Sequence, residues 1–291
     1  MKNRIIIGKK GMRMDARNKE ELIRNNIKSL AEIKRYVADN NSILMNLTIS
    51  GSHLYGFNSS DSDIDYRGIY IVNTNELLGL KKPKDVLNIK LKDEINDIVL
   101  FELKKEIDLA LKSNCNILEH INAKQIYNTS EFIELRRLIN NAFGKSGLYN
   151  SYNGMATFNY KKFIMGGKST TKKYLYVFRS LMAGIYVLQT GRIEPNLITL
   201  NKYFKIKEVT QLIKSKQENR EMSLVPEFKP HALEDRINEL FDRIDKAYEK
   251  SKIPDYPDEK DVLEINKFLL KIRKKYILWI IEKLKRNYCF L

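Results

Sequence analysis

Two apolar, β-prone runs joined by a Gly-Ser pair and a series of aspartates constrain the fold more than any other part of the chain. Residues 51–71 read GSHLYGFNSSDSDIDYRGIYI, and the apolar run LTI precedes them at residues 47–49. Side chains of a strand alternate between its faces, so Asp63 and Asp65 are expected to project to one side, at a Cα separation of about 7 Å. The stretch is either an acidic surface loop or a metal site built on a strand, with Asp61 serving the turn.

The residue types favour a metal and a phosphate. Two carboxylates on one face repel each other and raise each other's pKa unless solvent or a cation lies between them. Such oxygen ligands suit Mg²⁺ or Mn²⁺, and Mg²⁺ commonly adds phosphate oxygens of a bound substrate. Upstream, Gly51 would let the backbone approach a phosphate closely, and the Ser52 hydroxyl would donate to it. The order strand, Gly-Ser, short helix, D-x-D, strand therefore predicts a nucleoside triphosphate site.

The chain as a whole is expected to have a mixed α/β (α+β) N-terminal half with helices behind it. Strands are expected at 44–50, 63–72 and 97–101, with one edge strand within 81–97. Helices are expected at 18–38, 102–114, 135–143, 156–165, 170–190, 201–222, 231–250 and from 258, with a Gly-, Asn- and Tyr-rich joint at 144–154. The apolar stripe of the last helix indicates packing within the fold.

A surplus of basic residues indicates which kinds of partner the protein could bind. Lys and Arg total 52 against 36 Asp and Glu, a formal net charge of +16. This surplus favours nucleic acid, nucleotides or an anionic membrane surface, although a biased genome composition would produce the same surplus. The two cysteines and three histidines show no zinc-site spacing, and no stretch reaches the ~20 apolar residues of a membrane span. We therefore expect a cytoplasmic protein with no membrane span and no signal peptide.

The combined pattern resembles the signature of the DNA polymerase β nucleotidyltransferase superfamily: an apolar residue, Gly-Ser, about ten residues, then D-x-D. The longer string S-G-S-x-x-Y-G-x-x-x-x-D-S-D-I-D-x-R-G-I-Y is similar to one branch, the RNA-ligase-associated nucleotidyltransferases. The matching residues are Gly51, Ser52, Tyr55, Gly56, Asp61, Ser62, Asp63, Asp65, Arg67 and Gly68. The resemblance implies a polymerase-β-type mixed sheet flanked by helices, with a helical C-terminal region. It spans roughly residues 43–250. We expect an N-terminal helical extension (1–42), a catalytic core (43–125) and a helical C-terminal domain (126–291).

The resemblance also implies a metal site. Two Mg²⁺ (or Mn²⁺) ions would be held by Asp63, Asp65 and a third acid from the next core strand, and all three acids would be catalytic. Asp97, which opens the strand DIVLF, is the candidate for that third acid, and Glu102 at its far end is the rival. Asp93 and Glu94 are weaker alternatives.

A later helix is expected to complete the nucleotide site. Lys172, Tyr176 and Arg179 are spaced i, i+4, i+7 and share one face, where a triphosphate could bridge the two cations. The family typically shows K-x-x-x-H-x-x-R here, so Tyr176 replaces a His. It also shows a motif near N-P-N-x-L-E, and this chain has NCNILE at 114–119. The nucleotide-binding residues expected are Gly51, Ser52, Arg67, Lys172, Tyr176 and Arg179.

The favoured function is transfer of a nucleotidyl group from a nucleoside triphosphate to a hydroxyl acceptor with release of pyrophosphate. RNA, either a tRNA or an RNA end, is the favoured acceptor because of the basic surplus and the family's name. A protein or small-molecule acceptor is an open alternative, and so is an inactive module that only binds nucleotide or RNA. A membrane-surface role would rest on charge alone. The sequence predicts no oligomeric state and no preferred base.

Overall fold

A five-stranded mixed sheet forms the centre of the N-terminal half in the computed structural model, which describes residues 16–59, 62–90, 97–218 and 230–288. The strands lie in the order β3-β4-β2-β1-β5. β1 is antiparallel to both β2 and β5, β2 is parallel to β4, and β3 closes the other edge antiparallel to β4. Their bounds are β1 Ser42–Ser50, β2 Asp65–Val72, β3 Val86–Ile89, β4 Asp97–Glu102 and β5 Gln125–Asn128.

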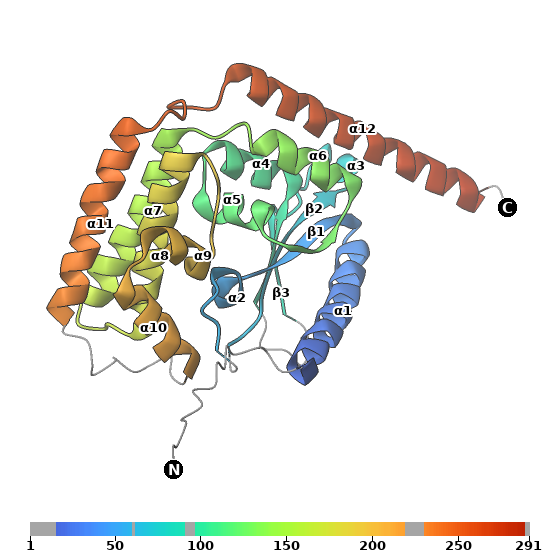
Figure 1. The fold of residues 1–291 in the computed structure, drawn as a ribbon. Helices are drawn as coiled ribbons and strands as arrows, with labels where there is room; N and C mark the ends of the chain where they lie inside the picture. Colours follow the sequence, from blue (N-terminus) through green and yellow to red (C-terminus); the bar gives the residue numbers. More distant parts are fainter. Residues whose placement is uncertain (1–15, 60–61, 91–96, 219–229, 289–291) are drawn as a thin grey trace, which may run out of the picture.

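Helices cover both faces of this sheet (Figure 1). The first helices are α1 Ala16–Asp39, α2 Gly51–Tyr55, α3 Thr74–Leu77, α4 Leu103–Leu111, α5 Cys115–Asn122 and α6 Ser130–Ile139. They are followed by α7 Lys145–Asn159, the π-helical segment η1 Tyr160–Met165, α8 Thr171–Thr190, α9 Leu197–Phe204, α10 Lys207–Glu218, α11 Pro230–Lys250 and α12 Glu259–Tyr288.

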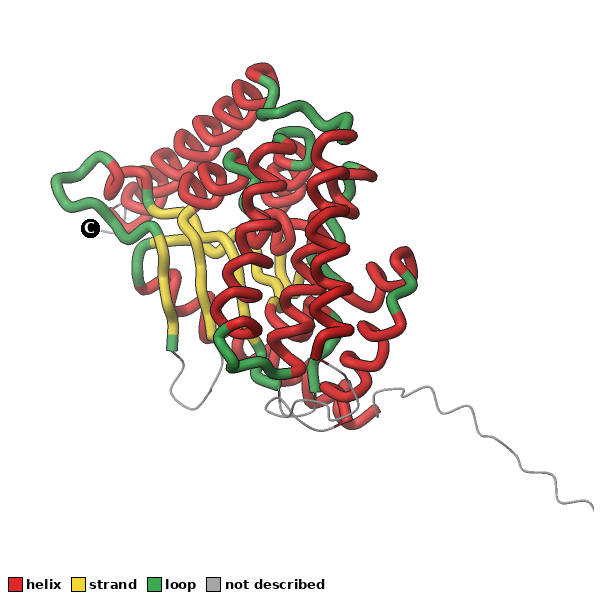
Figure 2. The backbone as a smooth tube through the Cα atoms, turned by 90° about the vertical axis from the view of Figure 1, so that its left-hand side faces the viewer, coloured by secondary structure: helices red, strands yellow, loops and turns green. Residues whose placement is uncertain are grey.

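Alternation along β2 separates two hydrophobic clusters. Tyr66 and Tyr70 pack on one face with Ile33 and Val37 of α1. Ile69 and Ile71 belong to a larger cluster that includes residues of the C-terminal helices. Figure 2 shows these helices standing beside the strands. The residues that line the sheet's larger core face therefore also face the helical part of the protein.

The C-terminal helices form a layer of long, nearly side-by-side elements. α8 is buried along most of its length, with α7 and α11 packed against it. α12 runs across α4, α6 and α3 at the top of the view in Figure 1. Arg273 of α12 donates to Glu102 at 2.7 Å, which ties this last helix to the end of β4. Among the described helices, none is both long and apolar enough to cross a membrane.

Most expected elements, and the α/β fold class, are confirmed. The strands expected at 44–50 and 97–101 are present, and so is the edge strand within 81–97. The strand expected at 63–72 begins at Asp65, so Asp63 lies just before it. The helix expected at 170–190 ends at Gly191, whose φ of 70° is left-handed. The helix expected at 135–143 covers residues 130–139 instead. The boundary expected between residues 125 and 126 falls inside β5, a strand that the sequence did not predict.

Two expectations about the helical part are wrong. The joint expected at 144–154 is the first two-thirds of α7, because Leu148, Tyr152 and Ala156 form a fully buried stripe at four-residue spacing. The single helix expected over 201–222 is broken into α9 and α10 at Lys205, whose φ of 57° is left-handed. Asn201 stabilises that break, since its side chain bonds both the backbone N–H and the carbonyl of Ile206.

Candidate active site

Three adjacent strands bring polar residues together where β1 ends and where β2 and β4 begin. In the register of the sheet Ser50 lies opposite Asp65, and Asp65 lies opposite Asp97. Residues directly opposite each other point to the same face. Asp63 is exposed two residues before Asp65. We call Asp63, Asp65 and Asp97 the strand-end carboxylates.

Gly51 is fitted to Asp65. Its φ of 60° lies in the left-handed region, and a Cβ added there would stand 1.7 Å from the Oδ2 atom of Asp65. No side chain can occupy that space while the carboxylate keeps its position. The glycine of the Gly-Ser pair thus lets the turn after β1 pass directly over the acidic end of β2.

The strand-end carboxylates influence one another electrostatically. Burial raises the pKa of Asp65, and the charges of Asp97 and Asp63 raise it further, while Arg67 and Lys172 lower it. Lys172 lies on α8, so the later helix is within electrostatic range of the acidic strand end. A site that holds anionic groups together in this way favours a cation.

Arg67 holds Asp97 in place. Its guanidinium donates to the Asp97 carboxylate at 2.7 Å and to the Asp97 carbonyl at 2.9 Å. Glu102, the rival third acid, lies at the opposite end of β4, where it caps α4 and pairs with Arg273. Only Asp97 of these two lies beside Asp65. Asp61, Asp93 and Glu94 fall outside the described residues.

The carboxylate oxygens of this site are the kind of ligand that a hard divalent cation prefers. They would supply only part of its coordination shell. Within the described ranges, no three His, Cys, Asp or Glu side chains are grouped closely enough to hold a metal ion by themselves. Mg²⁺ is commonly held by one or two carboxylates and completed by water and substrate phosphates. Asp63 and Asp65 fit that pattern, and Asp97 beside them is paired with Arg67 through its Oδ2 atom.

A pocket of about 510 Å³ opens beside the acidic strand end. It is lined by four of the expected site residues (Gly51, Asp65, Arg67 and Tyr176). The other lining residues were not among the expected site residues: Ser50, Tyr55, Phe101, Leu109, Asn114, Asn116, Ile117 and His120. Ser52 is not among the lining residues: it is buried in α2, where its carbonyl accepts from the backbone N–H groups of Gly56 and Phe57.

His120 is the most informative residue that the sequence did not identify. Its Nε2 lies 3.0 Å from the Ser50 hydroxyl, and its Nδ1 has no partner among the described residues. Burial lowers the pKa of His120 to about 3, and the nearby Arg67 and Arg179 contribute to that shift. The imidazole is therefore neutral at pH 7. A signal was available, because His120 directly follows the NCNILE segment and Ser50 opens the S-G-S string.

Arg179 supports the pocket from inside the protein. It is fully buried, it donates to Glu119 at 2.7 Å, and its Cζ lies 3.8 Å from the centre of the Tyr55 ring. Two segments quoted for the resemblance, NCNILE and the K-x-x-x-H-x-x-R region, thus meet in one buried ion pair. Arg179 does not line the pocket, but it contacts Tyr55, which does.

Tyr176 forms the aromatic wall of the pocket. Its ring packs edge-on against Tyr55 and Phe57, at centroid separations of 5.9 and 5.6 Å. The face of Tyr176 is therefore positioned by rings from the segment just after the Gly-Ser pair.

The loop between α2 and the strand-end carboxylates is fastened to the C-terminal helices. Lys216 of α10 is fully buried and donates to the Ser59 hydroxyl at 2.7 Å, and the Ser59 backbone N–H donates to the Ser62 hydroxyl. Asn196 packs against Gly56, where a Cβ would stand 2.6 Å from its Nδ2. The segment leading to Asp63 is thus positioned by residues more than a hundred positions away.

The sheet, the Gly-Ser turn and the acidic strand ends together define a polymerase-β-like nucleotidyltransferase fold. The chain belongs to the family described as "RlaP: RNA repair pathway DNA polymerase beta family", which matches residues 25–271. It is 30% identical over 233 residues to the "Uncharacterized protein YcgL" of Bacillus subtilis (strain 168), covering 76% of this chain and 86% of that protein. It is 27% identical over 220 residues to the "Uncharacterized protein MJ0002" of Methanocaldococcus jannaschii, covering 73% and 88%.

Among solved structures, the chain is similar to a nucleotidyltransferase-like protein from Exiguobacterium sibiricum 255-15. The identity is 12%, the TM-score is 0.28, and the match covers 86% of this chain and 80% of that one. The family assignment rests on the sequence match over residues 25–271.

Proposed function

We propose that the protein is a Mg²⁺-dependent nucleotidyltransferase that moves a nucleotidyl group from a nucleoside triphosphate to a hydroxyl of RNA and releases pyrophosphate. Membership of a polymerase-β-like family supports a transferase. The observation that carries the proposal is the pairing of Asp65 with Asp97 across parallel strands, under a Gly51 that admits no side chain.

The strand-end carboxylates have the chemistry of the catalytic group. Bound Mg²⁺ (or Mn²⁺, with two ions expected) would supply charge neutralisation for the triphosphate and the leaving group. Asp63 and Asp65 would hold it with their carboxylate oxygens. Asp97 would orient the acceptor hydroxyl and take its proton, while the bond from phosphorus to pyrophosphate breaks and the bond to the acceptor oxygen forms.

The pocket beside these carboxylates has the residues to hold the nucleotide. Gly51 lets the backbone approach a phosphate, and Arg67 and Lys172 would face the triphosphate charge. Tyr176 offers a ring face for the base or sugar. Ser52 would contribute to the turn, and Arg179 would act through Tyr55 as a positioning residue.

RNA is the proposed acceptor for two reasons. The family's description names an RNA repair pathway, and the formal net charge of +16 gives the protein an electrostatic attraction to polyanions. Neither observation identifies the base of the nucleotide or the type of RNA end.

Labelled nucleotides test this proposal directly. The protein is incubated with each nucleoside triphosphate labelled at the α-phosphate, with Mg²⁺ and total RNA, and the RNA and protein fractions are counted separately. We expect label in RNA, none after chelation of Mg²⁺, and none with Asp65→Asn. Label in protein instead would make the protein itself the acceptor. No label with any nucleotide, while a thermal shift still reports nucleotide binding, would mean a binding module.

A further inference from the structure

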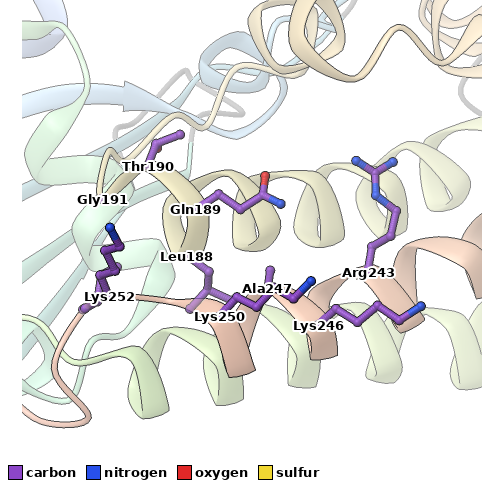
Figure 3. Close-up of a pocket in the computed structure, with 10 residues that line it drawn as sticks. Leu188, Gln189, Thr190, Gly191, Arg243, Lys246, Ala247, Lys250 and Lys252 are labelled. Carbon is purple, nitrogen blue, oxygen red and sulfur yellow. The ribbon is translucent and has the colours of Figure 1, made fainter.

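A groove of about 680 Å³ lies between the C-terminal ends of α8 and α11, separate from the pocket of the proposed active site. Figure 3 shows Arg243, Lys246 and Lys250 along one helix, Lys252 on the segment after it, and Gln189 on the facing helix. We call this the basic groove. The two pockets share no lining residue.

The lining of the basic groove carries positive charge only. Four of its ten lining residues are cationic and none is acidic. Among the described residues, the ion pairs of α11 are made by Arg236, which does not line the groove, and none is made by these four cations. Two helix C-termini meet here, and each carries roughly half a negative charge. Those termini together offset about one of the four positive charges. The acidic residues of the same part of α11, Asp242, Asp245 and Glu249, lie outside the lining of the groove, and Asp245 accepts from Tyr149 of α7.

Aromatic side chains border the same groove. Tyr203 of α9 is half exposed, and its hydroxyl donates to the Gln189 side chain at 3.2 Å. The Arg243 guanidinium lies 5.0 Å from the centre of the neighbouring Phe204 ring. Basic groups that track phosphates beside an exposed ring on which a base can stack are typical of single-strand binding surfaces.

The basic groove is connected to the proposed active site by α8 and by the segment after it. Tyr176 and Gln189 lie thirteen residues apart on one helix, which is about 20 Å at 1.5 Å per residue. Residues 191–196 lead from Gly191 in the groove to Asn196, which packs against Gly56 beside the active site. A stacked strand rising ~3.4 Å per nucleotide would need roughly six nucleotides to cover 20 Å.

We propose that the basic groove binds the sugar-phosphate backbone of a single-stranded segment of the acceptor RNA, about six nucleotides from the hydroxyl that reacts. Lys246 and Lys250 contact phosphates, and Tyr203 stacks on a base at the rim. The inference rests on RNA being the acceptor of the proposed reaction.

A charge-reversed pair and a matched control test the groove. Lys246→Glu with Lys250→Glu changes two exposed groove residues, and Lys82→Glu with Lys274→Glu changes two exposed lysines elsewhere by the same total charge. Binding of a fluorescent, unstructured 12-nucleotide RNA is measured by anisotropy without nucleotide, at several salt concentrations. We expect the groove variant to lose at least tenfold in affinity, and the slope of log K against log salt to shrink by roughly 1.4, two phosphate contacts at ~0.7 each. The control should stay within about threefold, as expected for general charge alone.

An equal loss of RNA affinity in both variants would contradict the proposed binding site, because only net charge would then matter. Unchanged RNA affinity in a groove variant that unfolds at the same temperature as the unmodified protein would contradict the proposal too. A vesicle of phosphatidylserine and phosphatidylcholine is the second probe: loss of vesicle binding with RNA binding retained would make the groove a membrane contact instead. Tyr203→Leu should weaken RNA binding at unchanged salt slope, since stacking carries no charge.

RNA length separates this inference from the proposed function. With transfer measured on a 20-nucleotide and a 3-nucleotide acceptor, the groove variant should lose efficiency only on the longer one. An equal loss of transfer efficiency on the 20-nucleotide and the 3-nucleotide acceptor would contradict the proposed distance between the groove and the reacting hydroxyl. Absence of transfer by the unchanged protein, with groove-dependent RNA binding intact, would remove the proposed function and leave the groove as an RNA-binding surface.

Discussion

At the scale of single residues, Gly51 has the least freedom in the proposed site, because it combines a left-handed backbone with contact to the Asp65 carboxylate. The sequence identified this glycine and its serine neighbour as a pair, and the structure separates their roles. Gly51 faces the pocket, whereas the buried Ser52 holds the turn through its backbone.

Gly51→Ala should remove transfer activity and cost roughly 1–3 kcal/mol of unfolding free energy, since an L-residue is strained at this φ and the new Cβ displaces Asp65. Denaturant unfolding and a transfer assay check this. The control is Gly154→Ala in α7, where nothing lies within 4 Å of the added Cβ. It should stabilise the protein by about 0.5–1 kcal/mol. A fully active Gly51→Ala enzyme would contradict the assigned contact.

Glu106 on α4 should make stability fall as pH rises. It is buried, its Oε2 has no partner among the described residues, and burial raises its pKa to about 8. Between its ordinary pKa near 4.5 and 8 the unfolded chain has released this proton and the folded chain has kept it. The stabilising contribution of the protonated form is therefore complete at low pH and lost as pH approaches 8.

The free energy of unfolding of Glu106→Gln should therefore rise relative to that of the unmodified protein when the pH is raised from 5 to 8. Urea unfolding at the two pH values measures this rise, which should be a few kcal/mol at most. The exposed Glu249→Gln serves as the control, with no gain. A stability difference between Glu106→Gln and the unmodified protein that is the same at both pH values would refute the shift.

At the scale of elements, the site depends on how α5, α8 and α10 are joined to the sheet. The sequence predicted α8 and its cap correctly, because a regular apolar period and Gly191 are local signals. It could not predict that Arg179 turns inward to Glu119, since a basic residue on a helix face reads the same whether it meets solvent, a phosphate or a buried acid. Lys216 and Ser59 were missed for a related reason: their bond joins positions 157 residues apart.

Removing one partner of the buried Glu119–Arg179 pair should destabilise the protein by about 3–5 kcal/mol, because the other charge remains unpaired in the core. Arg179→Met and Glu119→Gln each leave such a group. The double variant Arg179→Met with Glu119→Gln should cost clearly less than the sum of the two single changes. Strict additivity in denaturant unfolding would show that the two side chains do not act as a pair.

At the scale of the whole molecule, local patterns located the sheet and the acidic strand end, and long-range packing decided the rest. The Gly, Asn and Tyr content of the stretch around Gly147 predicted a joint. In the structure this stretch belongs to α7, and Gly147 packs closely against Lys112 and Ser113. β5 has only four residues and no strong alternation, so its place in the sheet depends on the partner strand β1. The contact between His120 and Ser50 depends on the fold, because the two residues lie seventy positions apart in the sequence.

The most direct test of the central claim is the rate at which α-phosphate label enters RNA in Asp63→Asn, Asp65→Asn and Asp97→Asn, with the exposed Asp39→Asn as control. The account predicts that each strand-end variant stays folded and loses roughly 100-fold or more, since each removes several kcal/mol of transition-state stabilisation, and that Asp39→Asn keeps full activity. A folded Asp65→Asn protein that transfers nucleotide at the unmodified rate would contradict it.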